Sequence, residues 1–204
     1  MDDLNKALAE IGSIRRQLAR STEFRGYGPA TLAATAAIAL FAACIQTQWA
    51  PEAAHHLDRY LSIWLTTAAV SAALIGTQMI TRAHRVHSGM ADEMIRIAVE
   101  QFLPSLGAGV LLTIVLARFV PGALWMLPGL WQVCSGIGIF SSCRFLPRPM
   151  LAAGAWYLLC GLLCISLAGE RALTPWAMGI PYGAGQLIVA GALCRKARED
   201  ANDD

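Results

Sequence analysis

Charge is scarce in this chain. Charged residues make up 15% of its 204 residues and hydrophobic residues 56%, whereas soluble domains carry about 25% charged residues. The shortage is concentrated, because six long runs contain no Asp, Glu, Lys or Arg. These runs are Gly26–Pro51, Tyr60–Thr81, Gln101–Ala117, Phe119–Cys143, Pro149–Gly169 and Ala172–Cys194. The pattern argues against a soluble domain and for a membrane protein.

The lengths of the six runs fit membrane-spanning helices. About 20 apolar residues cross a hydrocarbon layer of about 30 Å, and only the third run, with 17 residues, is shorter than that. Backbone polar groups in lipid must be satisfied within helices or barrels. The runs lack the in/out alternation of barrel strands. The sequence therefore predicts an all-α, polytopic protein with six transmembrane helices.

Basic residues predict the orientation. With six spans both termini lie on one side, and that side carries thirteen of the sixteen Lys and Arg residues. Because cytoplasmic loops carry the excess of Lys and Arg, we expect both termini in the cytoplasm and the chain in a bacterial inner membrane. The polar opening Met1–Glu10 does not fit a cleavable signal peptide. Three parts follow: a cytoplasmic segment 1–25, a transmembrane domain 26–195 and a polar tail 196–204.

Segment 1–25 has an amphipathic helical pattern. Leu4, Ile11 and Leu18 share one face, and basic residues lie on the other. Such a helix lies on the inner leaflet of a membrane or packs on a partner. The spacing of seven also fits a short coiled coil, so surface binding and self-association both stay open.

A faint internal repeat relates the two halves of the chain. Pro29 and Pro128 are followed at equal offsets by an Ile, a Phe and a Cys, while Pro104 and Pro181 are followed at equal offsets by a Leu and an Arg. Three helices followed by three more would form a 3+3 inverted repeat, a plan found among transporters. The alternative is that helices built from few residue types match by chance.

Proline and glycine cluster within the spans, and two interpretations are open. If the prolines break their helices, freed carbonyls and helix ends would line a cargo site. The alternative is that proline kinks the helix and glycine allows close packing. The candidate cavity residues are Gln132, Gln186, Pro104, Pro128, Pro181 and Gly185.

Catalytic and cofactor signatures are missing. No ionisable carboxylate or basic residue lies deep in a span, which disfavours proton-coupled carriers. There is no Cys-x-x-Cys pair, phosphate-binding loop or His-Glu-x-x-His motif. We therefore expect no cofactor and no enzymatic activity. One weak metal candidate is the loop after the second span, with spacing that suits a shared ion; its residues are His84, His87, Asp92 and Glu93.

The segments Phe24–Leu32, Met90–Thr113 and Leu127–Gly138 resemble those of small predicted bacterial inner-membrane proteins of unknown role. The six-helix plan is also similar to the substrate-capturing subunits of vitamin transporters, which dock a partner through small residues on helix one. Here Ala30, Ala34 and 37–39 offer such a face. The chain departs from those subunits in having no long outer loop.

Two functional hypotheses follow. The first is transport or binding of a small neutral or apolar solute. The second is a non-transporting scaffold or regulatory subunit that binds a cytoplasmic or membrane partner. Both imply contact with membrane lipid, and a homo-oligomer or a membrane partner subunit fits either. We expect no nucleic-acid partner.

Overall fold

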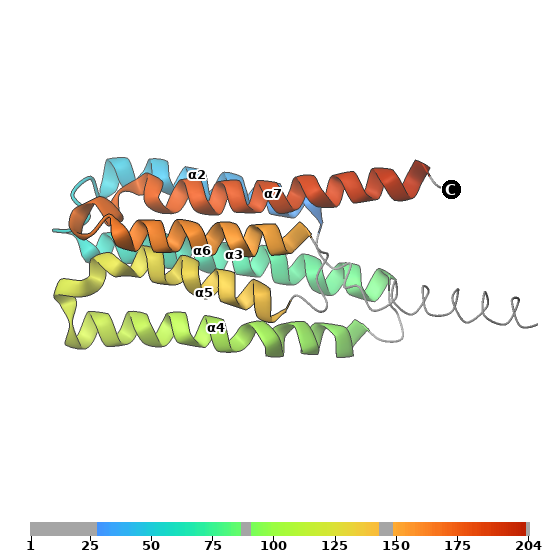
Figure 1. Ribbon diagram of the computed structural model, residues 1–204, viewed down its shortest axis with the longest axis horizontal. Helices are drawn as coiled ribbons and strands as arrows, with labels where there is room; N and C mark the ends of the chain where they lie inside the picture. The colour runs from blue at the N-terminus through green and yellow to red at the C-terminus, as the bar shows by residue number, and fades with distance from the viewer. Residues whose placement is uncertain (1–27, 87–90, 143–148, 203–204) are drawn as a thin grey trace, which may run out of the picture.

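The computed structural model describes residues 28–86, 91–142 and 149–202. Within these ranges all regular structure is helical, and the helices run side by side along one long axis (Figure 1). The elements are α2 Pro29–Trp49, α3 Leu57–Val86, α4 Ala91–Phe119, η1 Pro121–Met126, α5 Leu127–Ser141, α6 Pro149–Ser166, η2 Gly169–Leu173 and α7 Pro175–Asn202. The all-α prediction is confirmed, and the predicted amphipathic segment 1–25 lies outside the described residues.

Five of the predicted spans are long and apolar enough to cross a membrane. They are Pro29–Trp49, Leu57–Arg82, Val99–Phe119, Pro121–Ser141 and Pro175–Arg195. The apolar part of α6, Met150–Ser166, forms a shorter helix. The chain is thus a multi-pass membrane protein, while the six-span layout stays a prediction.

The bundle has two distinct ends. We call one the loop end: it holds the turn between α2 and α3, the corner η1, and η2, and it is the left end in Figure 1. We call the other the terminal end, because the C-terminal part of α7 extends there. Proline is the first residue of four of the eight elements, since its missing N–H is no loss in a first helical turn; examples are Pro29, Pro121 and Pro175.

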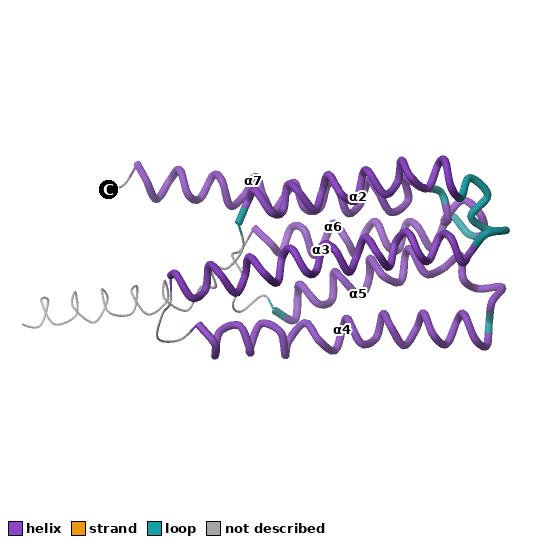
Figure 2. The backbone as a smooth tube through the Cα atoms, turned by 180° about the vertical axis from the view of Figure 1, so that it is seen from behind, coloured by secondary structure: helices purple, strands orange, loops and turns teal. Residues whose placement is uncertain are grey.

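Glycine and alanine bring two antiparallel helix pairs into close contact. In the α5–α6 pair, Gly129 faces Gly161 and Gly136 faces Gly154. In the α2–α7 pair, a Cβ on Gly179 would lie 2.6 Å from the Cβ of Ala43. Small residues let helix backbones approach closely, which is the main source of packing energy in lipid. Figures 1 and 2 both show α2 and α7 lying together along the bundle.

The helices differ sharply in burial. The most apolar windows of α2 and α7 are 39% and 44% buried, whereas those of α3 and α4 are 6% and 0% buried. Helix α4 lies at the edge of the bundle in both views (Figure 2). Most of the side chains of α3 and α4 are therefore directed away from the protein core.

The two internal prolines do not break their helices. Pro104 lies inside α4 and Pro181 inside α7, and both helices continue through them. Of the two alternatives, the broken helix therefore does not hold for these two spans, and a proline within a continuous helix does. Proline removes one i→i−4 hydrogen bond, but a partner for the freed carbonyl can keep the helix continuous. For α7 that partner is a side chain from α5, described next.

The loop predicted between the second and third spans is largely helical. α3 continues to Val86 and α4 begins at Ala91. Arg96 and Glu100 form an ion pair of 3.6 Å at i,i+4 spacing, which supports the interpretation of this stretch as a helical extension with acid–base pairs on an exposed face.

Candidate functional site

Gln132 of α5 occupies the centre of the candidate site. Its side chain is fully buried, and its Nε2 donates to the Ala177 carbonyl at 2.8 Å. In a regular helix that carbonyl would accept from the N–H of residue 181, but Pro181 has none. Gln132 therefore supplies the hydrogen bond that proline removes from α7. Its own Oε1 is buried and has no hydrogen-bond partner.

A second glutamine joins three elements near the loop end. Gln46 of α2 is fully buried. Its Nε2 donates to the Leu173 carbonyl of η2 at 2.8 Å, and its Oε1 accepts from Trp64 Nε1 of α3 at 2.7 Å. Both ends of this amide are thus hydrogen-bonded, as buried polar groups usually are. The bridge fixes η2 against α2 and α3.

Three tyrosines surround this part of the core. Tyr182 packs against both buried apolar clusters, one of which contains Tyr60 and the other Tyr157. The rings of Tyr157 and Tyr182 are 5.2 Å apart. Ser135 Oγ donates to the Trp131 carbonyl at 2.9 Å and lies 3.1 Å from Tyr182 Oη. Because the serine proton is committed to the carbonyl, the tyrosine donates in the second bond.

Two of the tyrosine hydroxyls have no partner. Tyr60 and Tyr157 are 1% and 3% exposed, and neither hydroxyl makes a hydrogen bond with any of the described residues. We call the whole group the polar core; its members are Gln46, Tyr60, Trp64, Gln132, Ser135, Tyr157 and Tyr182. It contains no Asp, Glu, Lys, Arg or His, so its chemistry is that of neutral hydrogen bonding between aromatic walls.

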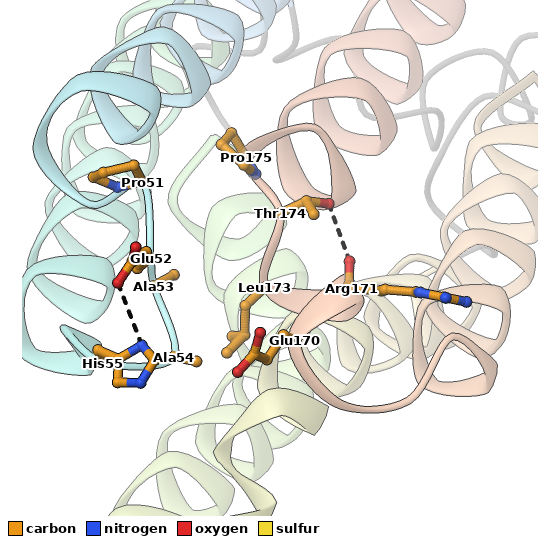
Figure 3. Close-up of a pocket in the computed structure, with 10 residues that line it drawn as sticks. All are labelled: Pro51, Glu52, Ala53, Ala54, His55, Glu170, Arg171, Leu173, Thr174 and Pro175. Atoms are coloured by element: carbon orange, nitrogen blue, oxygen red, sulfur yellow. Dashed lines mark hydrogen bonds and ion pairs between the residues drawn. The ribbon is translucent and has the colours of Figure 1, made fainter.

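A hollow of about 470 Å³ opens at the loop end (Figure 3). It is bounded by the α2–α3 turn on one side and by η2 with the start of α7 on the other. Glu52 and His55 lie 3.6 Å apart on its rim. Ala53 and Leu173 line the hollow and also belong to the buried cluster that holds Tyr60 and Trp64. These two side chains therefore link the hollow to the cluster that holds Tyr60 and Trp64.

The structure buries four of the predicted cavity residues. Pro128, Gln132, Pro181 and Gly185 are buried, and Gly185 abuts Tyr157, because a Cβ on it would lie 2.5 Å from that side chain.

The remaining two predicted residues lie elsewhere. Pro104 is exposed on α4, and Gln186 is only partly buried. Gln186 follows Ala177, the partner of Gln132, by nine residues of helix, which is about 13 Å along the axis at 1.5 Å per residue. The two glutamines are therefore at different depths, and a single small cavity lined by both does not fit this arrangement.

The predicted metal residues receive no structural support. His87 lies outside the described residues, as do the side chains of His84, Asp92 and Glu93. Among the residues that are described, no three His, Cys, Asp or Glu side chains are grouped so that they could hold a metal ion.

Sequence reasoning missed the tyrosines of the site. The chain has four tyrosines, and three of them lie in the polar core. Tyrosine in membrane proteins is enriched at the two interfaces, so Tyr157 and Tyr182, well inside their spans, were a usable signal. The hydrogen bond from Trp156 Nε1 to the Pro181 carbonyl, at 2.9 Å, could not be predicted from the sequence. Comparisons with protein-family models, curated proteins and solved structures find no match to this chain.

Proposed function

We propose that this protein binds a small uncharged solute in the polar core and passes it across a bacterial inner membrane. The observation that carries the proposal concerns buried polar atoms without partners. Of the five such atoms among the described residues, three belong to the polar core: Tyr60 Oη, Gln132 Oε1 and Tyr157 Oη. Each lies in or beside an aromatic-lined cluster. Ligand sites are typically apolar and aromatic, with a few polar groups that fix orientation.

The energetic argument favours a functional role. An unpartnered buried polar group costs about 1–3 kcal/mol. Phenylalanine in place of Tyr60 or Tyr157 would remove that cost without changing the helix pattern. A ligand or ordered water that supplies the missing partners gives a reason for these residues to be polar.

The absence of ionisable groups from the polar core limits the ligand. A buried charge without a countercharge costs several kcal/mol, so an anion or a cation would be poorly accommodated. A neutral solute avoids this cost. In a 3+3 inverted repeat with cytoplasmic termini, the solute site would lie between the two membrane faces.

A second candidate function rests on a different observation. The apolar windows of α3 and α4 are 6% and 0% buried, which leaves the outward-facing sides of both helices free for contact with another protein. A scaffold or regulatory subunit, as a homo-oligomer or with a membrane partner, would use these faces. Contact with lipid would explain this exposure equally well. The unpartnered polar atoms of the polar core have no such alternative explanation, so they favour the solute-binding function.

The test is a ligand screen in lipid nanodiscs. Thermal unfolding is measured with a series of small amides, alcohols and heteroaromatic compounds for the wild type, Gln132→Leu and Gln48→Leu. Gln48, on α2, is exposed, so Gln48→Leu makes the same substitution as Gln132→Leu outside the polar core and serves as the control. We expect at least one compound class to raise the Tm of the wild type and of Gln48→Leu but not of Gln132→Leu. Equal shifts in all three proteins, or none in any, would contradict the proposal.

A further inference from the structure

Contacts of the core follow one face of α7. The carbonyls of Ala177 and Pro181 accept hydrogen bonds from side chains of α5 and α6, and Gly185 abuts Tyr157; these three positions are four apart, which is about one turn of helix. Leu173, whose carbonyl accepts from Gln46, precedes them in η2 at the loop end. The contacts therefore form an ordered series that starts directly under the hollow at the loop end and continues into the bundle.

The hollow and the first contact share a residue. The side chain of Leu173 lines the hollow, while its backbone carbonyl accepts the hydrogen bond of Gln46. Ala53 likewise lines the hollow and belongs to the cluster of Tyr60 and Trp64. Leu173 and Ala53 thus form a buried apolar layer that contacts both the hollow and the cluster of Tyr60 and Trp64.

We infer that the polar core is loaded from the loop end, through this hollow and past Leu173, by an uncharged solute that carries an N–H or O–H donor. The inference rests on the proposed function and adds a route and a ligand class. Gln132 Oε1 can only accept a hydrogen bond, so its partner must donate. The hydroxyls of Tyr60 and Tyr157 can donate or accept, and they place no charge on the ligand.

The rim of the hollow agrees with this ligand class. The carboxylates of Glu52 and Glu170 lie on opposite sides of it, while the guanidinium of Arg171 extends away from it (Figure 3). An anionic solute would meet carboxylates at the rim and no cation within the polar core. Exclusion of anions therefore begins before the buried layer is reached.

A native thiol reports on the route. Cys164 of α6 is 3% exposed, and its Sγ lies 3.7 Å from the carbonyl of Ala172, the neighbour of Leu173. It is used in a chain whose other five cysteines are replaced by alanine. A second thiol is added by Ala54→Cys, in the hollow, or by Gly122→Cys, at the same end of the bundle but with open space around it.

The experiment blocks the added thiol and then measures the rate at which Cys164 is modified. The added thiol is first capped in nanodiscs with a bulky maleimide, and iodoacetamide, a small uncharged amide, is then applied. We expect the cap on Ala54→Cys to slow alkylation of Cys164 several-fold and the cap on Gly122→Cys to leave it unchanged. Equal rates with both caps, or a Cys164 that does not react in either uncapped protein, would overturn the route.

The ligand class is tested with a matched pair of reagents. Iodoacetate has nearly the shape of iodoacetamide but carries a carboxylate. We expect iodoacetate to lose far more rate at Cys164 than at the exposed thiol of uncapped Gly122→Cys. The same ratio of rates at both thiols would contradict the exclusion of anions.

Two further variants test the role of Leu173. Leu173→Ala should speed alkylation of Cys164 and Leu173→Phe should slow it, whereas Leu167→Ala, at an exposed position of the loop end, should do neither. Unchanged rates in both Leu173 variants would contradict passage at this residue. Labelling tests the route without any bound solute, so it can fail while the ligand screen succeeds, or succeed while the screen fails.

Discussion

Gly161 of α6 lies so close to Gly129 of α5 that a Cβ on it would stand 2.7 Å from the Gly129 carbonyl oxygen. Real Cβ atoms do not approach a backbone atom this closely, so no alanine fits without separating the helices. Gly136 and Gly154 repeat the relationship one heptad away, at 2.9 Å. The α5–α6 pair is therefore fixed by glycine at two levels.

Gly161→Ala should lower the free energy of unfolding by about 1–3 kcal/mol, the usual cost of overpacking a close contact. Gly107→Ala is the control, because nothing lies within 4 Å of a Cβ at that position of α4. There, alanine should be neutral or slightly stabilising through its helix propensity. Thermal unfolding in one detergent compares the two, and an equal effect would contradict the close α5–α6 contact.

The bond between Gln132 and Ala177 should depend on proline. Gln132→Leu should destabilise the wild type by about 1–3 kcal/mol, because it leaves a buried carbonyl without a partner. In Pro181→Ala the backbone N–H of residue 181 can reach that carbonyl, so the same leucine substitution should cost less. A double-mutant cycle of unfolding free energies measures the difference. Additive effects would show that Gln132 does not replace the hydrogen bond that Pro181 removes.

Trp64→Phe should destabilise the loop end. It deletes the 2.7 Å hydrogen bond to Gln46 Oε1 and leaves that buried acceptor unpaired, at a cost of about 1–3 kcal/mol. Trp176→Phe makes the same substitution at a residue that is 46% exposed and should have little effect. The thermal unfolding midpoints of the two variants give the comparison, and a larger loss for Trp176→Phe would contradict the bridge.

Ala168→Gly should stabilise the protein. Ala168 has a φ of 48°, a conformation that glycine adopts without strain but that costs other residues roughly 1–3 kcal/mol. Ala155→Gly, at an exposed position of α6, should instead destabilise by up to about 1 kcal/mol. Opposite shifts in the unfolding midpoint are expected, and two losses would show that the turn before η2 is unstrained.

The helices were predictable because each is marked by a long, continuous run of uncharged residues. Runs such as Tyr60–Thr81 contain no charged residue, and lipid leaves them no alternative to a helix. Gln132 and Pro181 were also found from sequence, as polar and proline residues that are unusual in a span.

The contacts were not predictable, because they join residues far apart in the chain. Nothing in the sequence pairs Gln132 with Ala177 or Gln46 with Leu173. Which residue of α7 lies beside Gln132, and hence how far Gln186 is from it, depends on how α5 and α7 are aligned along the bundle axis. The sequence therefore left open whether Pro181 breaks α7, because the carbonyl that Pro181 frees is satisfied by that same contact.

The most direct test of the central claim is an experimental structure in lipid nanodiscs, at a resolution that shows ordered water. We predict density for a solute or water within hydrogen-bond distance of at least two of three atoms, namely Tyr60 Oη, Gln132 Oε1 and Tyr157 Oη. A dry, closed core in which these atoms bond to one another would contradict the solute-binding function and leave the scaffold alternative.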